Sequence, residues 1–390
     1  MDCVYETYEG KDLSQLQKVT LVIPTHNRNY YLSRCLWYHA HFPFAEIIVA
    51  DSSDESKRRV NHQTISEIQQ MFSTKITYLE YDFPAEEYGG EIYRKWGDAV
   101  SRVETEFSLS CTDKEFLIPM TIAKSVMFLD EHPDYSIADG RYYMMKAMNL
   151  VLPWQGVNTL ELTSNDVLQR LNGLLNSNVP IGTQFALQRS KIHKSIFSNM
   201  DTYNLYDLRF GETEIELFPI LYGKLMRCPD AMSLRDITQN IKMTGFNRGT
   251  IVKSESSYLR YPWISDYPKV RYEKYLNSLT ECLINNSDEK VIEKVIEKVF
   301  HQRYLGTDLD EGKMKHPLLN KSSFMRYIWK KLPYEFKVII SKYFGSGMVE
   351  PRLRKNKMTK EIKIIIRLIK STSKYYETDS IVHHMMGDIR

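Results

Sequence analysis

Short apolar runs alternate with longer segments of helical spacing along the first third of the chain. The apolar runs predict buried strands at residues 19–24, 46–50, 76–81 and 107–111. Between them, apolar residues recur at the three- and four-residue intervals of amphipathic helices, over residues 30–41, 55–71 and 90–103. Strands that alternate with helices at such short intervals are typical of a doubly wound, mostly parallel sheet. We therefore expect a Rossmann-like α/β fold, with helices flanking a twisted sheet.

The pattern is less regular after residue 118, but it continues the same unit. Helices are predicted at 118–132, 165–175 and 214–222, and strands at 135–138 and 184–188, with strand-like pieces within 141–154. From about residue 247 the chain changes to long, charged, helix-favouring segments. The sequence therefore predicts an α/β domain over residues 1–250 and a basic, mainly helical domain over residues 251–390.

The charge of the chain is unevenly distributed. In all, 52 Lys and Arg face 49 Asp and Glu, but residues 311–390 hold 18 basic residues against 7 acidic ones. Segments 324–342 and 360–370 mix Lys and Arg with aromatic and aliphatic residues, as helices on anionic membrane surfaces do. The alternative is a helical domain that packs its apolar face on its neighbour or on a second subunit, as in a homo-oligomer. Nucleic acid is not an expected partner, because no nucleic-acid-binding module is recognisable.

The five cysteines indicate a reducing compartment. They are odd in number and widely spread, without a Cys-x-x-Cys pair, so neither a disulfide framework nor a structural zinc site is expected. The histidines are scattered, without the spacing of metal ligands. No signal peptide and no apolar run of about 18 residues is visible. We expect a cytoplasmic protein, with peripheral contact to the inner face of the cytoplasmic membrane as an option.

Two carboxylates follow the fourth predicted strand. Asp113 and Glu115 stand one residue apart, just after the apolar run 107–111. If the backbone stays extended there, both side chains point to the same side of the sheet. Paired oxygen ligands at the carboxyl end of a strand suit a divalent ion that carries a diphosphate. The plainer alternative is a solvated acidic turn.

Three motifs in order carry a family resemblance. They are Val-Thr-Leu-Val-Ile-Pro-Thr-His-Asn-Arg at 19–28, Ile-Ile-Val-Ala-Asp-Ser-Ser-Asp at 47–54, and the acidic pair after the fourth strand. Together they resemble the nucleotide-binding half of glycosyltransferase family 2, which has the GT-A fold. The resemblance covers roughly residues 17–240, and it implies an enzyme that uses a nucleotide-sugar donor.

The resemblance also implies roles for particular residues. Those expected to bind the nucleotide sugar are Pro24, Thr25, Arg28, Asp51, Lys95, Asp113 and Arg235. Asp113 and Glu115 are expected to hold Mn²⁺ or Mg²⁺ between the two phosphates. Here the chain departs from the family, because Glu115 replaces the second Asp and Lys114 stands between the carboxylates. A metal-free mode, with Lys95 or Arg94 supplying the positive charge, is therefore an alternative.

A general base is needed for transfer with inversion at the anomeric carbon, because the acceptor hydroxyl must lose its proton. The segment Gly-Glu-Thr-Glu-Ile-Glu-Leu at 211–217 resembles the family helix that carries this base. The alignment puts Glu214 in the base position, with Glu212 as a competitor. The plainer reading is that acids in the first turn favour the helix dipole.

The resemblance favours transfer of a sugar to a hydroxyl of a glycan or lipid-linked acceptor. The expected setting is bacterial surface polysaccharide or lipopolysaccharide assembly. One alternative is a nucleotidyltransferase, which also places acids at strand ends to bind metal and nucleotide. Another is a non-catalytic carbohydrate- or membrane-binding protein with a degenerate fold.

Overall fold

The computed structural model describes six continuous stretches of the chain and three single residues. It covers residues 11–83, 90–146, 150–153, 161–176, 183–206 and 210–236, together with Tyr8, Lys274 and Asn277. The boundary predicted near residue 250 and the basic segments 324–342 and 360–370 lie outside these residues, and so does the helical domain expected after residue 250, apart from Lys274 and Asn277. Among the described helices, none combines the length and apolar character that a membrane crossing requires.

The first half of the described chain alternates strands and helices as the sequence predicts. Its elements are η1 (Ser14–Lys18), β1 (Val19–Thr25), α2 (Asn29–His39), β2 (Glu46–Asp51), α3 (Glu55–Met71), β3 (Ile76–Glu80), α4 (Gly90–Ser101), β4 (Phe107–Ser110), β5 (Glu115–Leu117) and α5 (Pro119–Glu131). The second half comprises β6 (Tyr135–Lys146), β7 (Leu150–Pro153), α6 (Val167–Asn176), η2 (Thr183–Phe185), β8 (Leu187–Arg189), α7 (Ser190–Tyr203), α8 (Phe210–Tyr222) and β9 (Lys224–Asp236).

All described strands belong to one sheet, in the order β3-β2-β1-β4-β8-β6-β9-β5, with β7 paired to β6. Strands β1 to β4 are mutually parallel, and β6 pairs with β9 in parallel as well. Strand β8 pairs antiparallel with β4 and β6, β5 with β9, and β7 with β6. The predicted α/β class with a mostly parallel sheet is confirmed.

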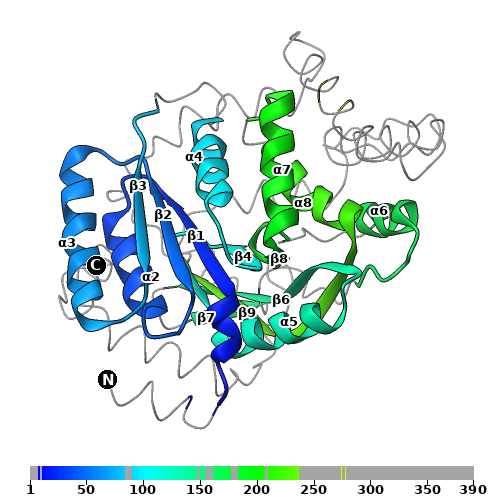
Figure 1. Ribbon diagram of the computed structural model, residues 1–390, viewed down its shortest axis with the longest axis horizontal. Coiled ribbons are helices and arrows are strands. Elements are labelled where there is room, and N and C mark those ends of the chain that lie inside the picture. Colours follow the sequence, from blue (N-terminus) through cyan, green and yellow to red (C-terminus); the bar gives the residue numbers. More distant parts are fainter. Residues whose placement is uncertain are drawn as a thin grey trace, which may run out of the picture.

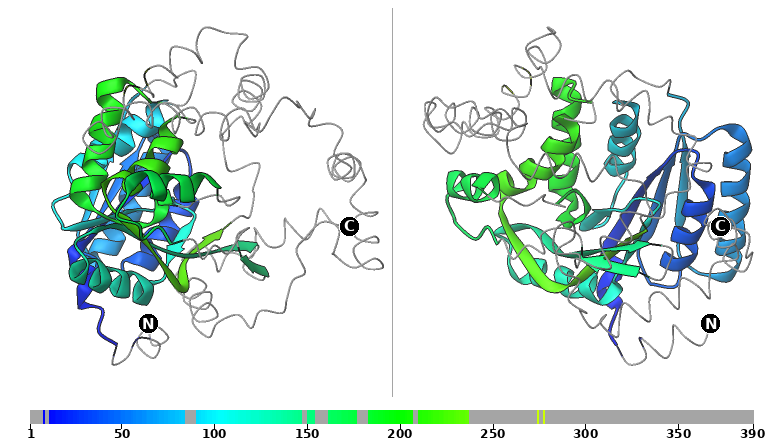
Figure 2. Two further views of the ribbon diagram at one scale, coloured as in Figure 1. Left: turned by 90° about the vertical axis from the view of Figure 1, so that its right-hand side faces the viewer. Right: turned by 180° about the vertical axis from the view of Figure 1, so that it is seen from behind.

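Two apolar clusters cover the two faces of the sheet. Successive residues of a strand point to opposite faces, so Leu21 and Ile23 join one cluster with α2, α3 and α5, while Val22 joins the other with α4, α6, α7 and α8. In Figures 1 and 2, α2 and α3 lie together on one side, and α4, α7 and α8 gather on the other. Helices therefore flank the sheet on both faces, as expected.

Several elements differ from the sequence prediction. Helix α7 was not predicted, and neither was β9, whose long pairing with β6 completes the sheet. The strand expected at 184–188 is a 3-10 turn, η2, followed by the short strand β8. The apolar residues of 183–189 are buried, but only Leu187–Arg189 find strand partners, in β4 and β6.

Candidate functional site

Residues from three separate motifs meet at the carboxyl edge of the parallel strands. Thr25 ends β1 and pairs in register with Asp51 at the end of β2, while the turn after β4 carries Asp113. The Thr25 hydroxyl donates a hydrogen bond to Asp113 Oδ2 at 2.8 Å. Arg28 Nη1 lies 3.3 Å from Asp113 Oδ1. The edge at which parallel α/β sheets bind ligands therefore carries a carboxylate, a hydroxyl and a guanidinium in contact.

Two loops at this edge are joined by hydrogen bonds. We name residues 24–28 the Thr25 loop and residues 51–54 the Ser52 loop. Asn27 N donates to Ser53 Oγ at 2.7 Å, and Asp54 N donates to Asn27 Oδ1 at 2.9 Å. Asn27 has a φ of 53°, a left-handed conformation that Asn tolerates better than most residues. The tight turn at Asn27 thus brings the two loops together.

Asp51 lies beneath these loops, with its carboxylate turned into the protein. Oδ1 accepts a hydrogen bond from Ser53 N at 2.7 Å, and Oδ2 accepts from Asn61 Nδ2 at 2.7 Å and from the Tyr78 hydroxyl. The side chain is fully buried. In this arrangement Asp51 fixes the start of the Ser52 loop, and its predicted contact with the donor stays a prediction.

The backbone between Asp113 and Glu115 is not extended, contrary to our expectation. It turns at Asp113 and Lys114, Glu115 N donates to Thr112 O at 3.0 Å, and Glu115 opens the separate strand β5. The turn is favoured because Thr112 N also donates to Glu115 Oε2, at 2.9 Å. Glu115 therefore starts a new strand, which pairs with β9.

Arg235 is the charged partner of Glu115. The two residues pair in register between β5 and β9, with Arg235 Nη1 3.7 Å from Glu115 Oε1. Burial raises the pKa of Glu115, while the charge of Arg235 lowers it in part. The predicted donor-binding residue Arg235 thus lies beside the predicted metal ligand.

The site presents positive groups to solvent and keeps its carboxylates inside. Asp113 and Glu115 are buried, whereas Arg28 and Arg235 each keep 30% of their side chains exposed. Lys114 is half-buried, with its ammonium 4.4 Å from the ring centre of Tyr31. An incoming diphosphate would meet guanidinium groups first, which suits its charge and geometry.

The residues around the turn are compatible with a divalent ion. Both carboxylates supply hard oxygen ligands, and the buried Glu115 Oε1 makes no hydrogen bond within the described residues. Arg28 would have to leave Asp113 for an ion to reach both groups. These oxygen ligands therefore suit Mg²⁺ or Mn²⁺. Arg28 and Arg235 would compete with the ion for the same carboxylate oxygens.

Glu214 lies on α8, far in sequence from the acidic turn at residues 113–115. Contacts through η2 connect this part of α8 to Arg235. Glu214 Oε1 accepts a hydrogen bond from Asn199 Nδ2 of α7 at 2.7 Å, and the side chain of Glu214 is buried. The Glu216 carbonyl, also on α8, accepts a hydrogen bond from the hydroxyl of Thr183, the first residue of η2. The Phe185 ring of η2 lies 5.6 Å from the Arg235 guanidinium. The side chain of Glu212 lies outside the described residues.

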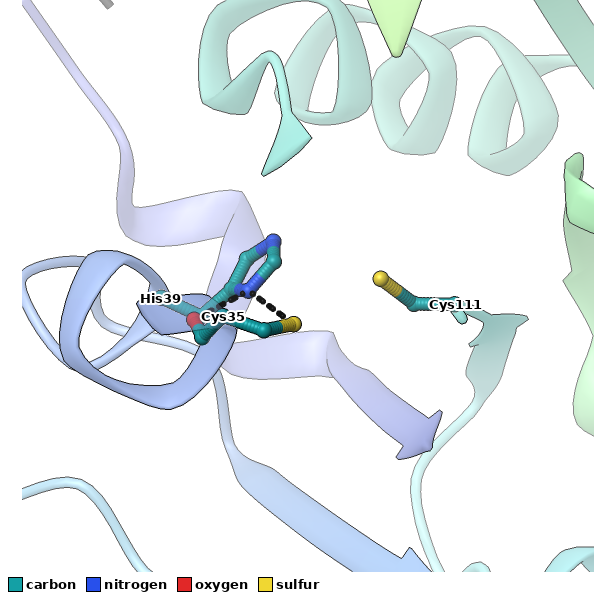
Figure 3. Close-up of side chains that lie close together, drawn as sticks. All are labelled: Cys35, His39 and Cys111. Atoms are coloured by element: carbon teal, nitrogen blue, oxygen red, sulfur yellow. Dashed lines mark hydrogen bonds between the residues drawn. The ribbon is translucent and has the colours of Figure 1, made fainter. Parts of the chain in front are cut away.

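A third group of side chains was missed by sequence reasoning. Cys35 and His39, one helical turn apart on α2, approach Cys111 at the end of β4, and their ligand atoms lie within 4.8 Å of one another (Figure 3). The four-residue spacing of Cys35 and His39 was the available signal, because residues i and i+4 share a helix face.

The hydrogen bonds of this group do not favour a metal ion. His39 Nδ1 lies 2.8 Å from the Cys35 carbonyl, and Nε2 accepts from Leu117 N at 3.2 Å, so one ring nitrogen is the donor and the other the acceptor. Both thiols face the carbonyls of Thr112 and Glu115. The group instead caps the edge of β5 that faces α2, and thereby supports the acidic turn.

Comparisons with known proteins give only distant similarities. No family model matches the chain, and no curated protein matches it. The solved structure of S. aureus TarS 1–349 is 13% identical with a TM-score of 0.47, and the match covers 92% of this chain and 91% of that chain. A complex of TarS 1–349 with UDP-GlcNAc has 13% identity and a TM-score of 0.46, over the same shares of both chains.

A second protein is the mannosyltransferase PcManGT from Pyrobaculum calidifontis, solved in complex with GDP-Man and Mn²⁺. It is 11% identical with a TM-score of 0.40, and the match covers 90% of this chain and 86% of that chain. At this level of similarity the bound molecules describe those proteins and not the activity of this chain.

Proposed function

We propose that this chain is a glycosyltransferase that moves a sugar from a nucleotide-diphosphate sugar to a hydroxyl acceptor. The observation that carries the proposal is the contact of Asp113 with Thr25 and Arg28 at the carboxyl edge of the parallel sheet. Two of the three sequence motifs that resemble glycosyltransferase family 2 supply these residues, and the third supplies Asp51, which pairs in register with Thr25. Their convergence is what a donor site needs, and an isolated acidic turn would not require it.

The donor would lie along the Thr25 and Ser52 loops, with its diphosphate toward Asp113. Arg28 and Arg235 are the exposed cations on either side of the acidic turn, and a guanidinium can donate two parallel hydrogen bonds to a phosphate. Pro24 and Thr25 supply backbone at the end of β1 for the nucleoside. Asp51 would act by holding the Ser52 loop or, after rearrangement, by accepting a bond from the base or ribose.

Asp113 and Glu115 would hold Mn²⁺ or Mg²⁺. When bound, such an ion stabilises the negative charge that builds on the departing diphosphate. Arg28 and Arg235, which lie beside these carboxylates, would donate hydrogen bonds to the phosphate oxygens and so stabilise the same charge. If no ion is used, these two arginines carry that task.

Glu214 is the proposed base for an inverting transfer. Its carboxylate would take the proton of the acceptor hydroxyl as that oxygen attacks the anomeric carbon and the bond to the diphosphate breaks. The hydrogen bond from Asn199 holds one carboxylate oxygen of Glu214 in place. Glu212 stays the second candidate for this role.

A glycan or lipid-linked acceptor, in bacterial surface polysaccharide or lipopolysaccharide assembly, is the proposed setting. It would suit a cytoplasmic enzyme whose segments 324–342 and 360–370 contact the inner face of the membrane or a second subunit. These elements of the proposal are based on the sequence.

Product analysis tests the reaction class. The protein is incubated with a panel of UDP- and GDP-sugars, with Mn²⁺ or Mg²⁺, and the released nucleotide is identified by chromatography. We expect slow release of nucleoside diphosphate by donor hydrolysis, and faster release when an acceptor is present. Release of pyrophosphate from a sugar phosphate and a nucleoside triphosphate would instead indicate a nucleotidyltransferase. Failure of every nucleotide sugar to bind would indicate a non-catalytic protein.

A further inference from the structure

Lys95 is a buried lysine at the junction of the two loops. It lies on α4, and only 2% of its surface is exposed. Helix α4 packs on β1 and β2, the strands that lead into the loops. A lysine is rarely buried so completely unless its ammonium has partners, so its position calls for a specific role.

The ammonium of Lys95 is bonded to both loops at once. Nζ donates to the Thr25 carbonyl at 2.6 Å and to Ser52 Oγ at 2.7 Å. Ser52 N donates to the same Thr25 carbonyl at 3.2 Å. Lys95 therefore connects the Thr25 loop to the Ser52 loop from the interior of the protein.

Charges around Lys95 offset its burial only in part. The carboxylates of Asp51, Asp113 and Glu91 favour the charged ammonium, while Arg28 opposes it. Burial lowers the pKa of Lys95 to about 8. Thr25 bonds both groups: its carbonyl accepts from the Lys95 ammonium, and its hydroxyl donates to the Asp113 carboxylate. The position of Asp113 is therefore linked to that of Lys95 through Thr25.

We propose that Lys95 is a positioning residue that clamps the Thr25 loop to the Ser52 loop and so fixes the nucleoside-binding edge and Asp113. This differs from direct contact with the donor phosphates, which the sequence alone suggested for Lys95. The consequence for donor binding rests on the proposed function, but the clamp itself is a property of the free protein.

Hydrogen exchange of the free protein tests the clamp. Lys95→Met keeps a long apolar stem but removes both hydrogen bonds, and Lys95→Gln keeps an uncharged donor that is one atom shorter. We expect the amides of Asn27, Ser53 and Asp54 to exchange at least about tenfold faster in Lys95→Met, and less so in Lys95→Gln, because a lost bond to a charged group weakens local stability by that order. Lys191→Met, an exposed lysine on α7, is the matched control. Unchanged exchange in both loops for both Lys95 variants would overturn the proposal.

Binding of nucleosides separates the clamp from a phosphate contact. Uridine, guanosine, UDP and GDP are titrated against the wild type and the variants. A clamp predicts that Lys95→Met weakens the nucleoside and its diphosphate by a similar factor, whereas a direct phosphate contact would weaken the diphosphate alone and overturn the proposal. If the wild type binds none of the four, the proposed donor class fails, and the exchange experiment still decides the role of Lys95.

Discussion

The hydroxyl of Thr25 donates a 2.8 Å hydrogen bond to the carboxylate of Asp113, although 88 positions separate the two residues in the chain. Both groups are buried at the carboxyl edge of the sheet, where β1 and β4 run side by side. This bond connects the loop expected to hold a nucleoside with the turn expected to hold a diphosphate. The following predictions concern residues of the proposed site and of the protein core.

Replacement of Glu214 by Gln should lower the turnover number by about 10²- to 10⁴-fold, because a general base typically contributes that much. Gln keeps an acceptor for the Asn199 hydrogen bond, so the fold should be retained. Donor binding, measured by calorimetry, should stay unchanged. Glu131→Gln, at the exposed end of α5, serves as the control. Wild-type turnover in Glu214→Gln would remove Glu214 from the mechanism and leave Glu212 to be tested.

The buried ion pair of Arg34 and Asp236 should be essential for stability. Arg34 Nη1 lies 2.8 Å from Asp236 Oδ2, and the two side chains are 3% and 2% exposed. Arg34→Met leaves a carboxylate without its charged partner inside the protein, which typically costs about 3–5 kcal/mol. Urea unfolding should therefore show a loss of this size. A loss below about 1 kcal/mol would mean that the pair does not anchor the end of β9.

The free energy of unfolding should depend on pH, because His193 takes up a proton when the protein unfolds. Its Nδ1 lies 2.8 Å from Ser108 Oγ and its Nε2 3.3 Å from Ser110 Oγ in the core. Burial lowers the pKa of His193 to about 3, whereas an unfolded chain binds this proton below about 6.5. The unfolded state thus holds more protons between these values, and stability falls as the pH falls through this window.

Urea unfolding from pH 6.5 down to the lowest pH at which the protein still folds measures the contribution of His193 to the pH dependence of stability. The free energy of unfolding of the wild type should fall by up to about 1.4 kcal/mol per pH unit more than that of His193→Gln. Equal slopes for the two proteins would mean that His193 is protonated in the folded state.

The group of Cys35, His39 and Cys111 should not bind zinc. Both His39 nitrogens are already bonded to backbone groups, and ligation would break at least one of these bonds. We expect added Zn²⁺ to leave the melting temperature unchanged, and Cys35→Ser to retain most of the stability, since a hydroxyl can donate to the same carbonyls. One zinc per chain by elemental analysis, lost in Cys35→Ser, would contradict this account.

The first half of the fold follows closely from the sequence. Strands β1 and β2 contain short apolar runs, and β3 and β4 alternate apolar with polar residues; both patterns are typical of strands in a sheet. Helix α7 carries Ile192, Ile196 and Met200 at helical spacing, but its start immediately after β8 leaves no turn to mark it. Strand β9 was missed because Pro229 and the charged residues around it interrupt the apolar pattern. Its length depends on pairing with β6 and β5, which are distant in sequence.

The residues of the site were easier to predict than their orientation. The positions of Thr25 and Asp113 follow from strand order, because carboxyl ends of parallel strands meet at one edge. The inward turn of Asp51 depends on Asn61 and Tyr78, and the burial of Glu115 depends on the register of β9. Such side-chain partners are set by tertiary packing, which local patterns do not contain. Lys95 was predicted to bind the donor, which stays a prediction, and its burial beneath the two loops was not predicted.

Release of nucleoside diphosphate by wild type and Asp113→Asn is the most direct test of the proposed function. Asn can still accept the Thr25 hydrogen bond, so the variant should fold, while the charge that would hold a metal ion or orient Arg28 is lost. With the nucleotide sugar that the wild type turns over fastest, we predict that Asp113→Asn releases the diphosphate at least about 100-fold more slowly. The exposed residue Asp130, changed to Asn, should have no effect. Release at the wild-type rate by a folded Asp113→Asn variant would contradict the account.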